Sequence, residues 1–273
     1  MFERKFAAAL WLSALLPVAA HAGNFSTSAL NPASLPANGV VAGDYPTGGG
    51  QENYYFAVDL KPGALASQIS TQRGVKYRTL TLALLDGAGA KLDSYYVTAS
   101  EDGREATRVF PIDSGGRYII RVTPEGPEAS AFRVALGGSA MPGRAPAETA
   151  SGASKSFLDP TPIPADGVVN GKFPGGTASS YYYFAGDLKA GQLMTQITLT
   201  GRAGAMKWAS LELLDEQGRV DQQYHLSRTD ASADATKSFA IDRSGRHVLR
   251  LTVQGVETNA YKIEFGGDAL AAK

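Results

Sequence analysis

Few side chains in this sequence have the types and the spacing that catalysis requires. After the first 22 residues only two histidines occur, His225 and His247. Asp242, Ser244 and His247 are the residue types of a nucleophilic triad. The aspartate and the serine, however, lie in a turn before the strand of the histidine, and no Gly-x-Ser-x-Gly motif presents a serine. We therefore predict no catalytic residue and interpret His247 as a partly buried, structural histidine.

Metal ligands are equally sparse. Asp86 and Asp215 each begin a glycine-containing turn, and Glu216 and Asp221 follow the second of them. A calcium loop of the EF-hand type needs oxygen ligands at alternate positions and a distal glutamate, and zinc needs closely spaced ligands. Neither pattern is present, so turn chemistry accounts for both aspartates. The sequence predicts no metal site and no cofactor.

Outward-facing side chains on strands are the remaining candidates for a site. Residues 53–60 alternate in character, so Tyr54 and Phe56 are expected to point into a core while Tyr55 points away from it. An exposed flat ring can stack on a sugar or anchor a protein partner. The alternative is that an outward tyrosine merely suits a strand and its cross-strand neighbours. The candidate binding residues are Tyr55, Tyr183, Arg121 and Arg250, and Tyr96 and Tyr181 are expected at similar exposed places.

An internal repeat positions these residues. The segment at residues 112–122 (IDSGGRYIIRV) returns at residues 241–251 (IDRSGRHVLRL), and the Tyr-Tyr-Phe-Ala of residues 54–57 returns at residues 182–185. The separation changes from 128 to 129 positions, which indicates one inserted residue near residues 202–207. A register kept over this length is typical of tandem homologous domains.

Each unit is predicted to be an antiparallel β-sandwich. Residues 54–60 and 117–122 show period-two alternation, and residues 78–86 are apolar enough to be a central strand; turns follow about every ten residues. Seven or eight short strands per unit predict two packed sheets. No amphipathic helix is evident after the first 22 residues. The predicted fold class is all-β, with two tandem antiparallel β-sandwich domains.

Other segments flank these two units. Arg4 and Lys5 precede an apolar run that ends in Ala20-His21-Ala22, which is typical of a cleavable export signal. The run is shorter than the about 20 apolar residues of a membrane helix. The predicted parts are a signal peptide at 1–22, a flexible leader at 23–35, a first sandwich at 36–138, a linker rich in Pro, Ala, Gly and Ser at 139–163, and a second sandwich at 164–268. A flexible linker would let the two domains reorient.

Composition restricts location and partners. The chain has no cysteine, which excludes disulfides, a thiolate metal site and a lipoprotein anchor. Removal of Glu3, Arg4 and Lys5 with the signal peptide changes 26 basic and 26 acidic residues to 24 and 25. Without a basic stripe, neither nucleic acid nor an anionic membrane surface is an expected partner, and no stable membrane insertion is expected. The predicted location is the periplasm or the cell exterior.

The motifs resemble those of a known family. Asn-Tyr-Tyr-Phe-x-Val-x-Leu at residues 53–60, Leu-x-Leu-Leu-Asp at residues 82–86 and Gly-Arg-Tyr-x-x-Arg-Val at residues 116–122 resemble the bacterial pre-peptidase C-terminal domain, and both units fit this pattern. The resemblance implies small jelly-roll sandwiches that usually accompany secreted peptidases and other exported enzymes, and some relatives bind polysaccharide or fibrous protein. The second unit departs from the pattern at His247, where the family has tyrosine, and the chain contains no peptidase domain.

Three functional hypotheses follow. The first is a non-catalytic exported binding or accessory protein that recognises a polysaccharide or an exported protein, with avidity from two linked weak sites. The second is a structural or assembly subunit of an exported enzyme or surface complex. The third is a hydrolase whose cleft contains His225 or His247 beside carboxylates. We favour the first, because the residues reveal no reactive centre.

Overall fold

The computed structural model describes residues 25–46, 50–72, 74, 77–100, 103–126, 130–141 and 153–270. These residues form strands and turns and contain no helix, so the all-β prediction is confirmed. Within these ranges no helix is long and apolar enough to cross a bilayer. The predicted signal peptide lies outside the described residues, and its cleavage stays a prediction.

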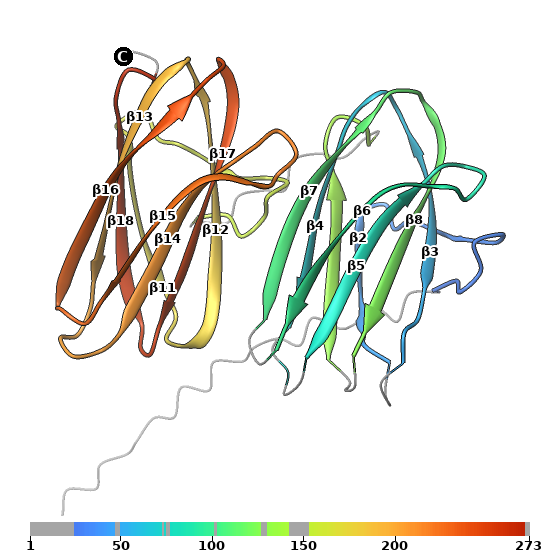
Figure 1. Cartoon of the computed structure of the whole chain (residues 1–273), viewed down its shortest axis with the longest axis horizontal. Coiled ribbons are helices and arrows are strands. Elements are labelled where there is room, and N and C mark those ends of the chain that lie inside the picture. Colours follow the sequence, from blue (N-terminus) through green and yellow to red (C-terminus); the bar gives the residue numbers. More distant parts are fainter. Residues whose placement is uncertain are drawn as a thin grey trace, which may run out of the picture.

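The first sandwich has two layers (Figure 1). The strand order is β1-β3-β8-β5-β6 in one sheet and β2-β9-β4-β7 in the other. Its strands are β1 (Ala33–Ser34), β2 (Val40–Asp44), β3 (Tyr54–Leu60), β4 (Gly63–Thr71), β5 (Arg78–Leu85), β6 (Lys91–Ala99), β7 (Arg104–Ile112), β8 (Gly116–Glu125) and β9 (Ala131–Gly137).

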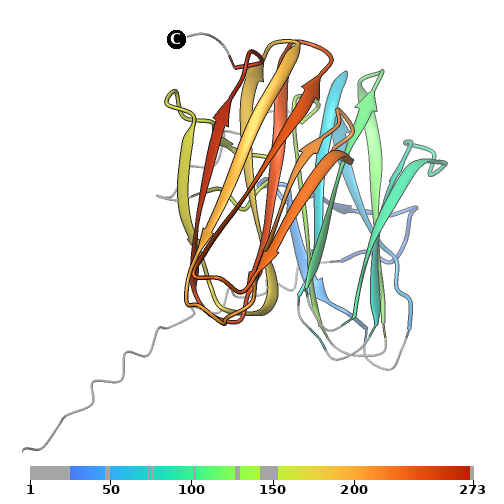
Figure 2. The same cartoon turned by 60° about the vertical axis from the view of Figure 1, so that its left-hand side comes forward.

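The second sandwich repeats this arrangement, with the orders β10-β12-β17-β14-β15 and β11-β18-β13-β16. Figure 2 shows the two layers of each sandwich from another direction. The strands are β10 (Thr161–Pro162), β11 (Val168–Phe173), β12 (Gly176–Leu188), β13 (Gly191–Thr200), β14 (Lys207–Leu214), β15 (Val220–Arg228), β16 (Ser232–Ile241), β17 (Gly245–Gly255) and β18 (Asn259–Gly266). The prediction of two tandem antiparallel sandwiches is confirmed. The eight strands from β2 to β9, and those from β11 to β18, have the connectivity of a jelly roll.

Alternating side chains of the strands fill the space between the layers. In β3, Tyr54, Phe56 and Leu60 are buried, whereas Tyr55 on the other face is partly exposed. Each sandwich contains one large apolar cluster to which both layers contribute. Burial contributes roughly 25 cal/mol per Å² of apolar surface. Because the chain has no cysteine, these two cores replace disulfides as the source of stability.

Segments that we expected to be loose pack against the sheets instead. Ser26 forms a bridge with Tyr55, and Ser154 forms the same bridge with Tyr183. Further along, β1 runs parallel to β3, and β10 runs parallel to β12. The described parts of the leader (23–35) and of the linker (139–163) are therefore held by backbone hydrogen bonds at a sheet edge. The domain boundaries themselves stay predictions.

The two sandwiches lie side by side in similar orientations (Figure 1). The turn between β14 and β15 reaches β7 of the first sandwich, where the Val109 amide donates to the Gln217 carbonyl at 2.8 Å. The corresponding turn between β5 and β6 projects in the same direction, away from the second sandwich. The contact therefore joins one side of the first sandwich to a different side of the second.

A glycine after β18 provides a test of this packing. Gly267 has a φ of +92°, and a Cβ there would lie 2.2 Å from the Gln192 carbonyl oxygen, whereas a Cβ on Gly266 would meet nothing within 4 Å. We expect Gly267→Ala to destabilise the second sandwich by about 2 kcal/mol or more, because the left-handed backbone and the close contact both oppose a side chain.

The matched control Gly266→Ala should change the stability by no more than about 0.5 kcal/mol. Urea unfolding followed by the fluorescence of Trp208 measures both variants, because the other tryptophan, Trp11, lies in the predicted signal peptide. Equal stabilities of the two variants would contradict the packing described here.

Candidate functional site

The predicted binding residues fall into two different environments. Tyr55 and Arg121 lie on the outer face of the first sandwich and are partly exposed. Tyr183 is 0 % exposed and the Arg250 side chain 13 % exposed, so the prediction of an exposed surface is wrong for this pair. Tyr181 is also packed there, with the Arg250 guanidinium 5.9 Å from its ring centroid. All these side chains point away from the core of their own sandwich. In the second sandwich, however, the outer face that contains Tyr181, Tyr183 and Arg250 is covered by the first sandwich.

A network of charged and polar side chains occupies the covered face. In the second sandwich, β17 places Arg250 between Tyr183 of β12 and Glu212 of β14. The Arg250 Nε donates to Glu212 Oε2. From β7 of the first sandwich, Glu105 accepts hydrogen bonds from the Tyr183 hydroxyl and, at 3.0 Å, from Gln68 Nε2. The network thus crosses from one sandwich to the other.

The pKa shifts in the network follow from burial and from neighbouring charges. Burial raises the pKa of Glu105, although the hydrogen bond from Tyr183 and the charge of Arg250 oppose the shift. Burial, followed by the Glu105 charge, raises the pKa of Tyr183 well above its ordinary value. Burial opposes the charged form of Arg250, but Glu212, Tyr183 and Glu105 together outweigh it, so the pKa of Arg250 is raised. Tyr183 is therefore a hydrogen-bond donor rather than a base, and Arg250 keeps its charge.

Apolar side chains complete the contact. Phe157, Tyr183 and Leu214 form a buried cluster against which Ala66 and Val109 of the first sandwich pack. The rings of Phe157 and Tyr183 meet edge to face, with their centroids 5.8 Å apart. Buried apolar side chains together with hydrogen-bonded polar groups are typical of a specific interface.

Hydrogen bonds to the backbone set the register of the contact. The Gln68 side chain accepts from the Phe157 amide at 3.1 Å and donates to the Lys155 carbonyl at 3.2 Å. The Thr107 hydroxyl donates to the Gly218 carbonyl in the β14–β15 turn. Since these bonds join side chains of the first sandwich to the backbone of residues 155–157 and of the β14–β15 turn, they hold the two sandwiches in one relative position.

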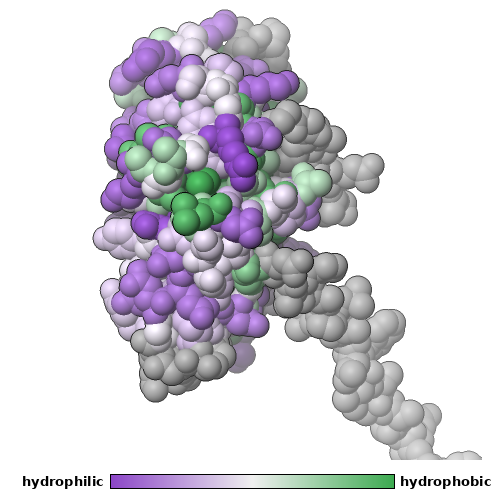
Figure 3. All heavy atoms as spheres, turned by 90° about the vertical axis from the view of Figure 1, so that its right-hand side faces the viewer, coloured by the Kyte–Doolittle hydropathy of each residue, from purple (hydrophilic) through white to green (hydrophobic). Residues whose placement is uncertain are grey.

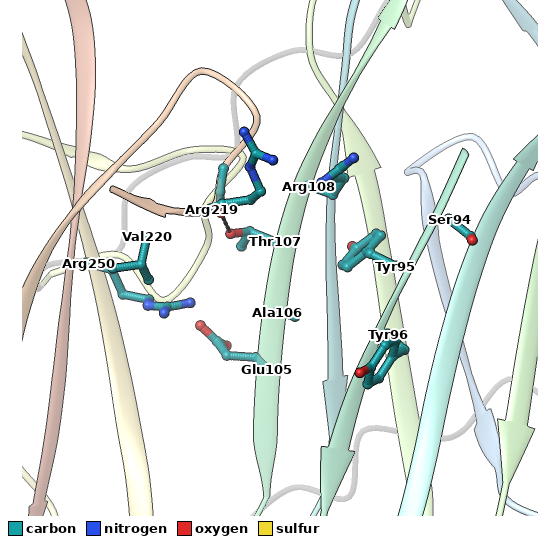
Figure 4. A pocket seen from close by; sticks show the side chains of 11 residues that line it. Ser94, Tyr95, Tyr96, Glu105, Ala106, Thr107, Arg108, Arg219, Val220 and Arg250 are labelled. Carbon is teal, nitrogen blue, oxygen red and sulfur yellow. Dashed lines mark hydrogen bonds between the residues drawn. The ribbon is translucent and has the colours of Figure 1, made fainter. Parts of the chain in front are cut away.

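A groove of about 410 Å³ opens beside the network (Figure 4). Tyr96, expected to be exposed, is 67 % exposed at its rim, so that expectation is confirmed. The polar side chains of the groove come from both sandwiches and include Glu105, Arg108, Arg219 and Arg250. Sequence reasoning missed the first three of these, because no local signal connects residues more than one hundred positions apart.

The guanidinium groups of the groove already have carboxylate partners. Arg108 pairs with Asp93 at 2.8 Å, and Arg219 pairs with Asp215 at 2.8 Å. Arg250 is paired with a carboxylate inside the network. Each arginine of the groove thus has a carboxylate partner within the protein, and a ligand need not supply one.

The side chains of His247 and Ser244 contact the backbone of nearby segments. A ring nitrogen of His247, Nε2, lies 2.9 Å from the Arg243 carbonyl oxygen, and the Ser244 hydroxyl accepts from the Ala190 amide at 3.1 Å. His247 is partly buried in β17, as the sequence predicted. His225 is exposed on β15 and does not line the groove.

The aspartates of the hairpin turns have a structural role. Asp86 Oδ1 accepts from the amides of Ala88 and Ala90 at 2.9 and 2.8 Å, and Asp215 Oδ1 makes the corresponding pair in the second sandwich. The interpretation of both residues by turn chemistry is confirmed. In the part of the chain that the structure describes, no group of three or more acidic or histidine side chains is placed to hold a metal ion.

Removal of the Arg250 guanidinium tests the role of the network in stability. Arg250→Ala would leave Glu212, only 9 % exposed, without its cation. We expect a loss of about 3–5 kcal/mol in the free energy of unfolding of the second sandwich, as found when one partner of a buried ion pair is deleted. Arg219→Ala, which removes a more exposed pair, should lose no more than about 1 kcal/mol. Urea unfolding monitored by Trp208 fluorescence compares them, and similar losses would contradict a structural role for Arg250.

The pKa of Glu105 predicts a pH dependence. A raised pKa in the folded state means that the folded protein binds this proton more tightly than the unfolded chain does. Its contribution to stability is therefore present at low pH and decreases as the pH rises above the ordinary glutamate range. The free energy of unfolding of Glu105→Gln, relative to the unsubstituted chain, should thus shift in favour of the variant between about pH 4 and 7. Denaturant titrations at several pH values measure this difference, and a shift in the opposite direction would refute the assignment.

Comparison with known proteins adds little beyond the fold. No protein-family model and no curated protein matches the chain. Among solved structures, the tandem CBM22-1–CBM22-2 domain of Paenibacillus barcinonensis Xyn10C is 10 % identical over 84 % of this chain and 91 % of its own, with a TM-score of 0.25. A Paenibacillus xanthan lyase is 10 % identical over 86 % of this chain and 26 % of its own, with a TM-score of 0.26. The exported protein XepA of PBSX is 10 % identical over 86 % of this chain and 89 % of its own, with a TM-score of 0.23. Scores this low assign neither a family nor a ligand, and the chain is defined by its own geometry as two jelly-roll sandwiches joined through a buried charged network.

Proposed function

We propose that this protein is a non-catalytic, exported binding or accessory protein whose ligand site is the groove between the two sandwiches. The observation that carries the proposal is the exposed ring of Tyr96 in the lining of a groove whose polar side chains come from both sandwiches (Figure 4). A groove of about 410 Å³ is within the usual range for a small-ligand site. The predicted export signal and the resemblance to the pre-peptidase C-terminal domain support an accessory role outside the cytoplasm.

The chemistry of the groove favours a neutral polysaccharide as the ligand. The tyrosine ring offers a flat surface on which a sugar ring can stack. Sugar hydroxyls both donate and accept hydrogen bonds, which suits a groove that contains guanidinium and carboxylate groups. Because Arg108 and Arg219 are each paired with an aspartate, an anionic polymer would gain little from them.

A hydrolytic role is less well supported. A catalytic carboxylate must be available to the substrate, whereas the two oxygens of Glu105 accept hydrogen bonds from Tyr183 and Gln68. Glu212 is paired with Arg250 beneath the groove. Both carboxylates therefore serve the contact between the sandwiches.

Substitution of Tyr96 tests the binding site. We expect the predicted mature chain, residues 23–273, to be retarded in affinity gels that contain a neutral polysaccharide, with mixed β-glucan, xylan, dextran and starch as probes. Tyr96→Ala should weaken the retardation about tenfold, because an aromatic contact contributes about 1 kcal/mol beyond its buried area.

Tyr77→Ala is the matched control, since Tyr77 is similarly exposed but does not line the groove. Its affinity should equal that of the unsubstituted chain. Two results would overturn the proposal: no retardation of the unsubstituted chain by any of the four polymers, or an equal loss in both variants.

A further inference from the structure

The internal duplication leaves two surfaces of the protein without the partner that their counterparts have. The contact between the sandwiches joins the outer side of β4 and β7 in the first sandwich to the outer face of β12, β14 and β17 in the second. Each sandwich has both surfaces, because the two share one fold. Among the residues that the structure describes, the outer side of β13 and β16 in the second sandwich, here called the free edge, therefore takes no part in a contact between sandwiches. The same holds for the outer face of β3, β5 and β8 in the first, here called the free face.

The free edge has polar side chains of the same kinds as the corresponding edge of the first sandwich, formed by β4 and β7, which lies in the contact. In the contact, Gln68 donates to Glu105, and the neighbouring Thr107 donates to a turn of the second sandwich. The counterparts on β13 and β16 have the same pairing register. They are Gln196, Asp234 and Thr236. Gln196 Nε2 donates to Asp234 Oδ2 at 3.3 Å, so an acid of the same kind is held in place, but exposed to solvent.

The free face has the counterparts of the two residues that interact with Glu105 in the contact. Tyr55 and Arg121 lie side by side on β3 and β8, as Tyr183 and Arg250 do on β12 and β17. Opposite Arg121, however, β5 has Ala83 where β14 has a glutamate. The Arg121 Nε is buried and has no hydrogen-bond partner among the described residues. This guanidinium thus lacks the carboxylate that its counterpart has.

One apolar side chain of the free face is also left exposed. Leu158 packs into the contact between the sandwiches, whereas its counterpart Leu30 is 98 % exposed. Beneath this face, Ala83, Leu85 and Ile119 form a small buried apolar cluster, and the partly exposed Tyr55 packs on it. Figure 3 shows hydrophobic side chains surrounded by hydrophilic ones on the side of the first sandwich that is turned away from the second.

Side-chain sizes on the two free surfaces are complementary. In the existing contact a large residue of the face, Phe157, belongs to the same cluster as a small residue of the edge, Ala66. At the free surfaces the sizes are exchanged, since the counterpart of Phe157 is Ala29 and that of Ala66 is the exposed Met194. A large side chain would again meet a small one.

We propose that a second copy of this chain docks its free edge on the free face and reproduces the internal contact between molecules. Asp234 of one copy then takes the place of Glu105, between the Tyr55 hydroxyl and the Arg121 guanidinium of the other. The carbonyls of the exposed turn at residues 86–90 receive Thr236, as the β14–β15 turn receives Thr107. Because the two surfaces differ, the association is head to tail and extends beyond a dimer or closes into a ring.

Sedimentation velocity of residues 23–273, without polysaccharide, tests the association. The weight-average mass should rise with protein concentration across roughly the micromolar to near-millimolar range expected for a contact of this kind. Asp234→Arg places a cation opposite Arg121, and Arg121→Glu places an anion opposite Asp234. Each variant alone should self-associate at least tenfold more weakly than the unsubstituted chain.

An equimolar mixture of Asp234→Arg and Arg121→Glu should regain the association, because every edge in the mixture then has an oppositely charged face available on the other variant. Asp113→Arg, an equal charge change in the exposed β7–β8 turn, is the control and should associate like the unsubstituted chain. Circular dichroism and Trp208 fluorescence confirm that each variant is folded. If Arg121→Glu fails to fold, Leu30→Glu on the same face, at a fully exposed side chain, replaces it and should also abolish the association.

A constant monomer mass of the unsubstituted chain over the whole concentration range would overturn the proposal. An association that survives both charge reversals would do the same, since another surface would then be responsible. Failure of the mixture to recover, with both variants folded, would exclude the pairing of Asp234 with Arg121. Since no polysaccharide is present, none of these results depends on the groove binding a ligand.

Discussion

The largely buried guanidinium of Arg250 is the constraint on which the arrangement of the two sandwiches depends. A charge that leaves water must find carboxylates and hydrogen-bond acceptors in the protein, or its burial is costly. Glu212 supplies a partner from the same sheet, and Glu105 is brought near by the other sandwich. Tyr183 links the two sides, because its hydroxyl donates to Glu105. The sandwiches are therefore held in one relative position, and the groove beside the network exists only because of that position.

The duplication explains how one fold provides both halves of this contact. Both sandwiches have a face with a tyrosine beside an arginine and an edge with a glutamine beside an acid. The edge of the first sandwich and the face of the second are complementary and bury each other in the contact. The free face and the free edge differ from these surfaces by a few substitutions. The main one is Ala83 in the first sandwich, where the second has Glu212. A single change of this kind converts a satisfied arginine into one whose Nε has no acceptor in the described structure.

Much of the fold could be predicted, but less of the candidate site. The alternation in residues 53–60 correctly identified which side chains of β3 enter the core, and the same reasoning correctly turned Tyr183 away from its own core. It could not reveal that the outer face of β12 is covered, because that depends on Glu105 and Gln68, which lie nearly eighty or more positions earlier in the chain. From the sequence, Arg219 could likewise be interpreted only as a turn residue. In the structure it lines the groove together with residues of β7.

The sequence by itself determined the strands, the core-facing residues, the turn role of Asp86 and Asp215, and the duplication, because each of these follows from local periodicity or from comparison of the two halves. Only the tertiary structure decided which outward side chains remain in solvent. Burial of an outward residue is a property of whichever second surface lies against it, and no period in the chain records that surface. Tyr55 and Tyr183 have the same local sequence and the same strand position, yet one is partly exposed and the other is buried against the first sandwich.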